Sequence, residues 1–375
     1  MRTAVIVIPT YNEAGSISKL IQEILKIQEN LTRWQLKILV IDSNSPDNTA
    51  KIVKELQKTS KNIYLVQTEK EGLGKAYVTG FKYSLDHFYP YVIFEMDADL
   101  SHNPNNIPDF LNAIENGADF VIGTRYSKGG SIPKDWAFHR KLFSVLGNLV
   151  IRFGFAKLSI SDWTSGYRAM KSWVVKQSVN KVEKYSGYVF QVATLDEALK
   201  NNAEIVEIPI NFTDRIEGVS KINSFQFIVQ TLLYVIMNSS FIKYVIVGGT
   251  SAIIDFGLSF IFIELWNITI WVSTLISVET SIIYNFLLNN FWSFSHKKLD
   301  SKVKYSNIKG FFKFNFLQSF LLLIQVLGMF VLVNFFGEKW WFVYKFLILI
   351  FVIVPLSYFL YNKFIWKSKK SLRKN

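Results

Sequence analysis

The sequence predicts two parts, an α/β domain with a mostly parallel sheet and a helical membrane domain behind it. In residues 1–223, short β-branched runs alternate with stretches of helical periodicity. From residue 224 onward, this alternation stops and long apolar stretches follow one another. Half of the 375 residues are hydrophobic and the mean hydropathy is +0.21, which is high for a soluble enzyme. The chain is also long enough for both parts.

The α/β part is predicted from five short strands and two amphipathic helices. The predicted strands span residues 4–8, 37–41, 63–67, 91–96 and 120–123. Residues 16–26 and 49–57 have the apolar spacing of helices. Strands that alternate with helices form a mostly parallel sheet, which binds ligands beyond the carboxyl ends of its strands. Polar clusters follow at those ends, at residues 9–13, 42–47 and 97–99.

The second part is predicted to enter the membrane. Residues 224–240 are strongly apolar but short, which favours an amphipathic helix lying in the membrane interface. Four longer stretches, each close to the ~20 residues that cross a bilayer, form a domain over residues 241–375. They span residues 241–264, 268–290, 314–336 and 340–362. The alternative is a very apolar globular core, but tryptophans flank these stretches, as in interfacial belts.

Basic residues predict the orientation of these spans. Lysines gather in the connection at 297–313, and lysines and an arginine in the tail at 363–374. The connections near Asn267 and Gly337 are short and carry at most Lys339. The positive-inside tendency therefore places the α/β domain, the basic connection and the tail in the cytoplasm. The N-terminus lacks the features of a signal peptide, so we expect the α/β domain to stay in the cytoplasm. The four apolar stretches predict a multi-pass protein of the cell membrane.

The net charge and the cysteine content of the chain limit which partners and metal sites it can have. The net charge of +13 is compatible with nucleic acid, phosphorylated substrates or anionic membrane lipids. Because many of the basic groups flank the apolar stretches, anionic lipid headgroups account for much of the charge without nucleic acid. The absence of cysteine excludes disulfides and thiolate metal sites. The oligomeric state is left open by the sequence.

The strongest local signal for chemistry is Asp97-Ala98-Asp99, directly after the predicted strand 91–96. Two carboxylates at this spacing can share one hard divalent cation with a diphosphate, and Mg²⁺ or Mn²⁺ suits oxygen ligands. The cation would stabilise charge on a nucleoside-diphosphate leaving group. A solvated turn is the alternative for an isolated pair, but the position at a strand end favours the metal.

A series of further motifs resembles a known family. It begins with Pro9 to Glu13, Asp42 with Ser45 to Asp47, Gly72 to Gly74, Met96 to Pro104 and Gly123 to Tyr126. It continues in order with Ser165 to Arg168, Gly187 to Gln191, Asp214-Arg215 and Ser220-Lys221. Over residues 4–222 the chain resembles the inverting family-2 glycosyltransferases, and more narrowly the dolichol-phosphate mannose synthases. The C-terminal part, with Gly248-Gly249 and Asn289 to Phe294, resembles the four-span GtrA-like domain.

The resemblance implies a GT-A fold, which is Rossmann-like, and a set of donor-binding residues. Those for the nucleoside would be Pro9, Tyr11, Glu13, Ile41 and Asp42. Asp97, Ala98 and Asp99 would face the diphosphate and sugar, with Asp99 catalytic and a metal ligand. Two positions depart from the family. Ser101 stands where some members have glutamine, a better metal ligand, and Ser43 stands where the family often has a second aspartate.

Basic residues would complete the implied site. Arg125 is assigned to catalysis and to donor binding, and Arg215 and Lys221 would close over the donor diphosphate. Arg140 and Ser144 lie one helical turn apart and would grip the acceptor phosphate together with Arg125. For each of these basic residues, the alternative is a solvated surface charge without a role in binding. For Arg140 this alternative stays open.

The implied reaction is transfer of mannose from GDP-mannose to dolichyl or polyprenyl phosphate, with inversion to the β anomer. The acceptor phosphate is already ionised near neutral pH, so a general base is optional and none is assigned. One alternative is the same chemistry with UDP-glucose. Two others belong to different classes, namely a flippase for the lipid-linked sugar and a membrane-anchored nucleotide-binding protein without turnover.

Overall fold

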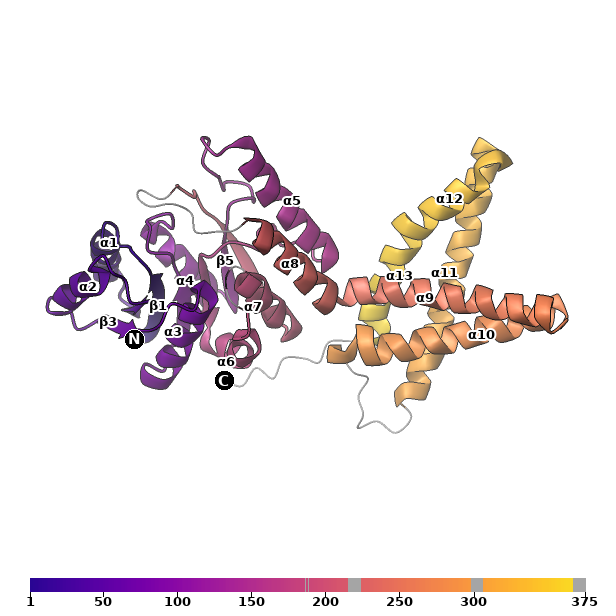
Figure 1. Cartoon of the computed structure of the whole chain (residues 1–375), viewed down its shortest axis with the longest axis horizontal. Helices are drawn as coiled ribbons and strands as arrows, with labels where there is room; N and C mark the ends of the chain where they lie inside the picture. Colours follow the sequence, from indigo (N-terminus) through magenta and orange to yellow (C-terminus); the bar gives the residue numbers. More distant parts are fainter. Residues whose placement is uncertain (186, 188, 215–223, 298–305, 367–375) are drawn as a thin grey trace. The chain divides into compact units, whose positions relative to one another are not determined.

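The structure is a computed structural model that describes residues 1–185, 187, 189–214, 224–297 and 306–366. The described residues form two compact units that meet in the chain between Val235 and Ile236. The first is an α/β unit and the second is helical (Figure 1). Each unit is described by itself below.

A seven-stranded sheet forms the centre of the first unit, with strand order β3-β2-β1-β4-β6-β5-β7. Every pairing is parallel except those of β6, which runs antiparallel to β4 and β5. The strands are β1 (Arg2–Thr10), β2 (Trp34–Asp42), β3 (Ile63–Gln67), β4 (Val92–Glu95), β5 (Phe120–Thr124), β6 (Arg168–Lys171) and β7 (Ile205–Pro209). The predicted α/β class with a mostly parallel sheet is confirmed.

Helices cover both faces of the sheet because successive residues of a buried strand point to opposite sides. Ala4, Ile6 and Ile8 of β1 pack in one core with α1 (Ile17–Glu29) and α4 (Ile107–Glu115). On the other face α3 (Leu73–His87) lies against β1, where a Cβ on Gly80 would come within 2.3 Å of Val7 Cγ1. Only glycine permits this close approach. The remaining helices here are α2 (Thr49–Gln57), η1 (Pro104–Asn106), α6 (Ser172–Val182) and α7 (Val189–Lys200).

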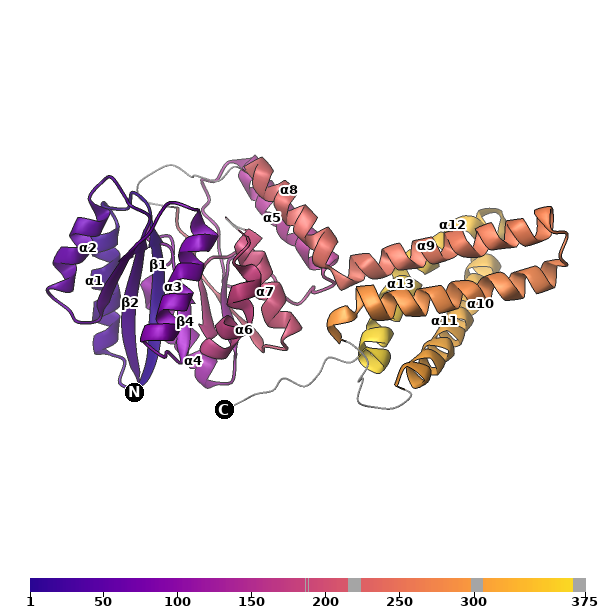
Figure 2. The ribbon, with the colours of Figure 1, turned by 60° about the horizontal axis from the view of Figure 1, so that its bottom comes forward.

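Two further helices of this unit lie side by side, α5 (Phe138–Gly154) and α8 (Ser224–Asn238) (Figure 2). Tyr234 of α8 is buried and anchors the helix, since its hydroxyl donates to Asp196 Oδ2 of α7 at 2.7 Å. The Tyr234 ring also packs on Phe155, which follows α5, at 6.2 Å. The helix predicted over 224–240 is therefore present, although its assignment to the membrane interface remains a prediction.

Both helices keep large apolar side chains exposed. On α5 these include Phe138, Leu142, Phe143, Leu146 and Phe153. On α8 they are Val229, Leu232, Leu233, Ile236 and Met237. Exposed apolar surface of this extent marks a contact surface for a partner or a membrane. The sequence pattern indicated a contact with the membrane for α8 but not for α5.

The second unit is helical throughout its described residues. It contains α9 (Ser240–Phe260), α10 (Ile270–Leu288), α11 (Ser306–Phe336), α12 (Trp341–Ile348) and α13 (Val354–Leu360). Short turns extend or join them: η2 (Ile261–Leu265), η3 (Asn289–Ser293), η4 (Ser295–Lys297), η5 (Glu338–Trp340), η6 (Leu349–Ile353) and η7 (Tyr361–Ile365). Three described segments are long and apolar enough to cross a membrane, Ser240–Leu265, Asn307–Phe336 and Phe346–Ile365.

The second predicted span, at 268–290, coincides with α10, which is not among these three segments. α10 carries Ser273, Ser277 and Ser281 at four-residue intervals, and all three are buried. Ser277 Oγ donates to Asp255 Oδ1 of α9 at 2.7 Å, and Ser251 Oγ of α9 donates to the Ser281 carbonyl at 3.0 Å. The polar residues of α10 therefore hold α9 and α10 together.

Candidate active site

Loops that follow β1, β2 and β4 meet at one edge of the sheet. Parallel register places Thr10 opposite Asp42 and Pro9 opposite Ile41. β4 ends at Glu95, two residues before Asp97, and antiparallel β6 begins at this edge with Arg168 opposite Glu95. The predicted residues of all three loops are thus gathered at the carboxyl edge, as expected for ligand binding.

The loops after β1 and β2 are joined by carboxylates. Asp42 is fully buried, and its carboxylate accepts hydrogen bonds from Thr10 Oγ1 at 3.0 Å and from Ser45 Oγ at 2.6 Å. Asp47 accepts from the Ala14 backbone N–H at 3.0 Å. Burial raises the pKa of Asp47, but its hydrogen bonds outweigh burial and lower the pKa below its ordinary value. Asp42 and Asp47 therefore fix the loops after β1 and β2 to one another.

Other predicted nucleoside-binding residues lie around these loops. Ser43 is nearly buried beside Asp42, and Pro9 and Glu13 are half-buried. The Tyr11 ring lies 3.6 Å from Lys70 Nζ, which adds a cation above the loop. Lys70 was not among the predicted residues, and its place before Gly72 offers no pattern that would single it out.

The Asp97–Asp99 loop is held by a buried histidine. The Asp97 backbone N–H donates to His102 Nδ1 at 3.0 Å, so the neutral ring carries its proton on Nε2. Tyr77 Oη donates to Asp97 Oδ1 at 3.2 Å. His102 is 2% exposed and stacks on Tyr167 with ring centroids 4.9 Å apart. His102 lies within the motif from Met96 to Pro104 but was not among the predicted site residues, and its ring positions the first aspartate of the loop.

Asp99 and Ser101 present oxygen atoms in the same loop. The Ser101 backbone N–H donates to Asp99 Oδ1 at 3.1 Å. Ser101 Oγ is buried and has no hydrogen-bond partner among the described residues. Those residues contain no group of three or more His, Cys, Asp or Glu side chains that could hold a metal ion. A cation here would consequently need oxygen atoms from a substrate or from water to complete its shell.

Arg125 follows β5 and forms a buried ion pair that the sequence did not reveal. Its Nε and Nη2 donate to the two carboxylate oxygens of Asp162 at 2.7 and 2.9 Å. Burial raises the pKa of Asp162, but the charge and hydrogen bonds of Arg125 outweigh it and hold that pKa below its ordinary value. Asp162 in turn holds the pKa of Arg125 above its ordinary value. Arg125 is thus anchored before any ligand arrives.

Arg140 and Ser144 lie on α5, as their spacing predicted. Arg140 is 41% exposed, pairs with Asp214 at 3.2 Å and lies over the Trp136 ring at 3.9 Å. The Ser144 hydroxyl forms a short hydrogen bond with the Tyr126 hydroxyl. Both residues therefore lie close to the Arg125 loop. Arg215 and Lys221 lie outside the described residues.

One aromatic ring joins these parts of the site. Phe212, beyond β7, lies 6.0 Å from the His102 ring and 5.9 Å from the Trp136 ring, measured between centroids. The Arg125 guanidinium carbon is 5.5 Å from the Phe212 centroid. The structure thus brings the aspartate loop, Arg125 and the segment before α5 together around Phe212.

Comparison with known proteins identifies the family. The family model for "Glycosyl transferase family 2" matches residues 5–181, and that for "GtrA/DPMS, transmembrane domain" matches residues 243–366. The polyprenol monophosphomannose synthase of Mycolicibacterium smegmatis is 36% identical over 58% of this chain and 80% of that protein. The dolichol-phosphate mannosyltransferase of Pyrococcus furiosus is 31% identical over 77% and 80%. The undecaprenyl-phosphate mannosyltransferase of Micrococcus luteus is 34% identical over 58% and 86%.

The chain belongs to the polyprenyl-phosphate mannosyltransferases of glycosyltransferase family 2. The resemblance drawn from the motifs is confirmed, including the GtrA-like membrane domain. In this glycosyltransferase the aspartate loop, the Arg125 loop after β5 and the loops after β1 and β2 occupy one edge of one sheet.

A buried ion pair lies directly behind the aspartate loop of this glycosyltransferase. Arg168 Nε lies 3.9 Å from Glu95 Oε2, and both side chains are fully buried. Burial raises the pKa of Glu95 from its ordinary value near 4.5 to about 7, although the charge of Arg168 opposes this. Arg168 also donates to the backbone carbonyls of Gln191 at 2.6 Å and Trp163 at 2.8 Å. Arg168 therefore ties β4, α7 and the loop before β6 together.

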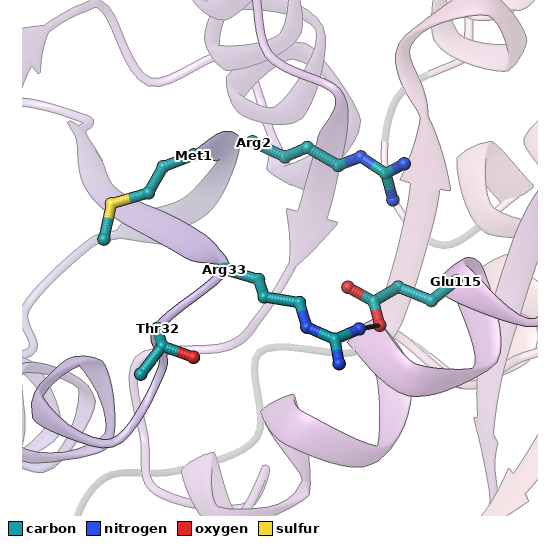
Figure 3. A pocket seen from close by; sticks show the side chains of 5 residues that line it. All are labelled: Met1, Arg2, Thr32, Arg33 and Glu115. Carbon is teal, nitrogen blue, oxygen red and sulfur yellow. Dashed lines mark hydrogen bonds and ion pairs between the residues drawn. The ribbon is translucent and has the colours of Figure 1, made fainter.

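A hollow drawn in Figure 3 lies at the opposite edge of the sheet. It has a volume of about 650 Å³ and is lined by Met1, Arg2, Thr32, Arg33 and Glu115. Arg33 Nη1 and Glu115 Oε2 form an ion pair across it at 3.1 Å. Because β1 and β2 begin here and end at the candidate site, this hollow plays no part in the glycosyltransferase site.

Proposed function

We propose that this glycosyltransferase transfers mannose from GDP-mannose to a polyprenyl or dolichyl phosphate with inversion, giving a β-mannosyl phosphopolyprenol. The observation that carries the proposal is the Asp97–Asp99 loop at the carboxyl edge. Asp99 and Ser101 stand two residues apart there, both are buried, and Ser101 Oγ has no hydrogen-bond partner among the described residues. The names of the relatives supply the acceptor class and the sugar.

Asp99 and Ser101 would hold a divalent cation, Mg²⁺ or Mn²⁺. A carboxylate and a hydroxyl are oxygen donors of the kind these ions prefer, and Ser101 Oγ lacks a partner within the described residues. When bound, the cation would neutralise charge on the leaving diphosphate. Asp97 and Ala98 would face the diphosphate and sugar. Asp99 would thus act in catalysis through charge stabilisation.

The nucleoside would lie over the loops after β1 and β2. Thr10, Ser45 and Asp47 fix the two loops to one another, so this part of the site is preorganised. The proposed contacts are Pro9, Tyr11, Glu13, Ile41, Asp42 and Ser43. Arg215 and Lys221, outside the described residues, would close over the diphosphate.

The acceptor phosphate would lie at Arg125, Arg140 and Ser144. One of its oxygens attacks the anomeric carbon of mannose as the bond from that carbon to the nucleoside diphosphate breaks, and attack from the opposite side inverts the anomer. The phosphate is already ionised near neutral pH, so positioning replaces proton removal. Arg125 is held rigidly by Asp162, whereas Arg140 is more exposed and lies on α5.

The protein would be anchored in the cell membrane with its α/β unit and tail in the cytoplasm. Basic residues between α10 and α11 and in the tail support this orientation. The domain layout would be residues 1–223 for catalysis, 224–240 in the interface and 241–375 in the membrane with four helices. The exposed apolar side chains of α5 and α8 would reach the headgroup region, where the acceptor phosphate lies.

A donor screen tests the proposal. The purified full-length chain is incubated with polyprenyl phosphate, a divalent cation and either GDP-mannose or UDP-glucose, and lipid-linked sugar is measured. We expect mannosyl lipid from GDP-mannose and loss of activity with a chelator. Turnover of UDP-glucose alone would establish the glucosyl alternative. Transbilayer movement of lipid-linked sugar without any transfer would establish the flippase.

A further inference from the structure

Gln191, near the start of α7, is a buried amide beside the candidate site. Its side chain is 1% exposed, and its amide oxygen Oε1 has no hydrogen-bond partner among the described residues. Its backbone is fixed, because Arg168 Nη1 donates to the Gln191 carbonyl at 2.6 Å. Buried polar atoms are normally paired, so an unpaired one in a rigid setting indicates a missing ligand.

The side-chain amide of Gln191 lies close to Gly166, as do the side chains of His102 and Asp97. A Cβ on residue 166 would lie 3.5 Å from His102 Cε1, 3.6 Å from Gln191 Nε2 and 3.7 Å from Asp97 Oδ2. These are ordinary contact distances, so all three groups border the side of Gly166 that carries no side chain. A ligand atom would have to lie beyond the absent Cβ, in the space in front of that side. The Asp97 side chain is 32% exposed, which makes this space reachable from the candidate site.

The chemistry of these groups favours a hydroxyl over a phosphate. An amide both donates and accepts hydrogen bonds, and an ionised carboxylate only accepts. A sugar hydroxyl can donate to one of them and accept from the amide nitrogen. A phosphate oxygen only accepts and would be repelled by Asp97. The space is therefore suited to the sugar and not to either phosphate of the reaction.

We propose that Gln191, together with Asp97, recognises one hydroxyl of the transferred sugar in the space next to Gly166. Gln191 then determines which sugar is accepted, because a donor lacking that hydroxyl leaves the buried amide unpaired. The inference rests on the proposed function only in that the donor is a nucleotide sugar. Nucleoside, cation and acceptor phosphate bind elsewhere in the site.

Calorimetry on the full-length protein tests the contact without turnover. The affinities of GDP and of GDP-mannose are measured with Mn²⁺ present, and their ratio gives the contribution of the sugar. We expect Gln191→Leu to lower GDP-mannose affinity about tenfold and to leave GDP affinity unchanged. Gly166→Ala, whose methyl group fills the space without a clash, should do the same. Gln35→Leu, at the amino end of β2, is the matched control.

A set of monodeoxy GDP-mannose donors identifies the hydroxyl. Removing the recognised hydroxyl should lower kcat/KM in the wild type and cause no further loss in Gln191→Leu. Equal losses in both proteins for every analogue, or a fall in GDP affinity that matches the fall in GDP-mannose affinity, would overturn the inference. Gly166→Ala keeps the test decisive if Gln191→Leu fails to fold.

The experiments distinguish a wrong proposed function from a wrong role for Gln191. A wild-type protein that uses UDP-glucose instead refutes the mannose proposal, and the same comparison is then made with UDP and UDP-glucose. The wild type could form lipid-linked mannose while both variants still bind GDP-mannose more tightly than GDP by the same factor as the wild type. That result would refute only the role of Gln191.

Discussion

At the residue scale, the candidate site depends on a few oxygen atoms. They are held in place by residues that no sequence pattern links to them. The Asp99 carboxylate is nearly buried, and its loop is fixed by His102 and Tyr77 through Asp97. We expect Asp99→Asn to remove about 2–4 kcal/mol of transition-state stabilisation, a rate loss of roughly 10²–10³-fold, because a preorganised charge is lost. The measurement is kcat for lipid-linked mannose across a titration of Mn²⁺.

Asp86→Asn is the control for this substitution, since Asp86 is exposed near the end of α3. It should leave kcat unchanged. Activity of the wild type that persists in the presence of chelator would contradict a metal role for Asp99.

Glu95 predicts a pH dependence of stability. Its pKa of about 7 lies above the ordinary value near 4.5, so the folded protein binds this proton more tightly than the unfolded chain. The stabilisation is fully present below about 4.5 and is lost as the pH rises through about 7. Glu95→Gln, which stays neutral, should flatten the fall in thermal midpoint between pH 5 and pH 8 in detergent. An unchanged slope would show that Glu95 is ionised throughout.

The two arginines of the acceptor site should behave differently. Arg125→Ala leaves Asp162 buried without its charge partner, so we expect the α/β unit to lose about 3–5 kcal/mol of unfolding free energy. The Arg140–Asp214 pair is exposed and contributes about 0–1 kcal/mol. Arg140→Ala should keep the fold and donor affinity, and lower kcat/KM for the lipid tenfold or more. Loss of donor affinity with normal acceptor kinetics would reverse the assignment.

The sequence motifs predicted candidate site residues, but they did not predict which residues contact them. Ring contacts of Phe212 and Trp136 and the Tyr126–Ser144 hydrogen bond link the loop after β4, Arg125 and helix α5, which carries Arg140 and Ser144. Their partners, by contrast, come from distant segments. Asp162 binds Arg125 from 37 residues away, and no local pattern announces such a pair.

At the element scale, the sequence predicted β1 to β5, but it missed β6 and β7, although β7 contains the β-branched residues Ile205, Val206 and Ile208. β3 and α2 have the predicted bounds, and β1 and β2 extend slightly beyond theirs. β6, with the sequence RAMK, is four residues long and has a basic residue at each end. Its register opposite β4 depends on tertiary packing, which periodicity does not encode.

The exposed apolar faces of α5 and α8 lead to a prediction about membrane binding. A fragment ending at Asn238 should bind vesicles that contain anionic lipid. Phe143→Glu and Leu233→Glu should each weaken binding about tenfold or more, because burying one such side chain contributes about 1.5–3 kcal/mol. Sedimentation with vesicles measures this, with Tyr89→Glu, exposed before β4, as the control. A fragment that stays in solution would show that these faces bind something other than lipid.

At the scale of the whole molecule, the number of spans decides which side of the membrane each connection occupies. Among the residues that the structure describes, three helical segments qualify by length and composition, and α10 is not one of them. We nevertheless expect α10 to cross, because its serines are paired with Asp255, Ser251 and Ser259 of α9 and are thereby shielded from lipid. Four crossings return the tail to the side of the α/β unit.

Because the chain has no cysteine, single cysteines report this topology without background. Ser301→Cys and Ser371→Cys should react with a membrane-impermeant maleimide only after the membrane is opened. Asn267→Cys and Lys339→Cys, in the short connections, should react from outside in intact cells. If α10 did not cross, Ser301 and Ser371 would both lie outside, since three crossings move the tail to the opposite side. External labelling at those two positions would therefore reject the four-span arrangement, and internal labelling would exclude a three-span one.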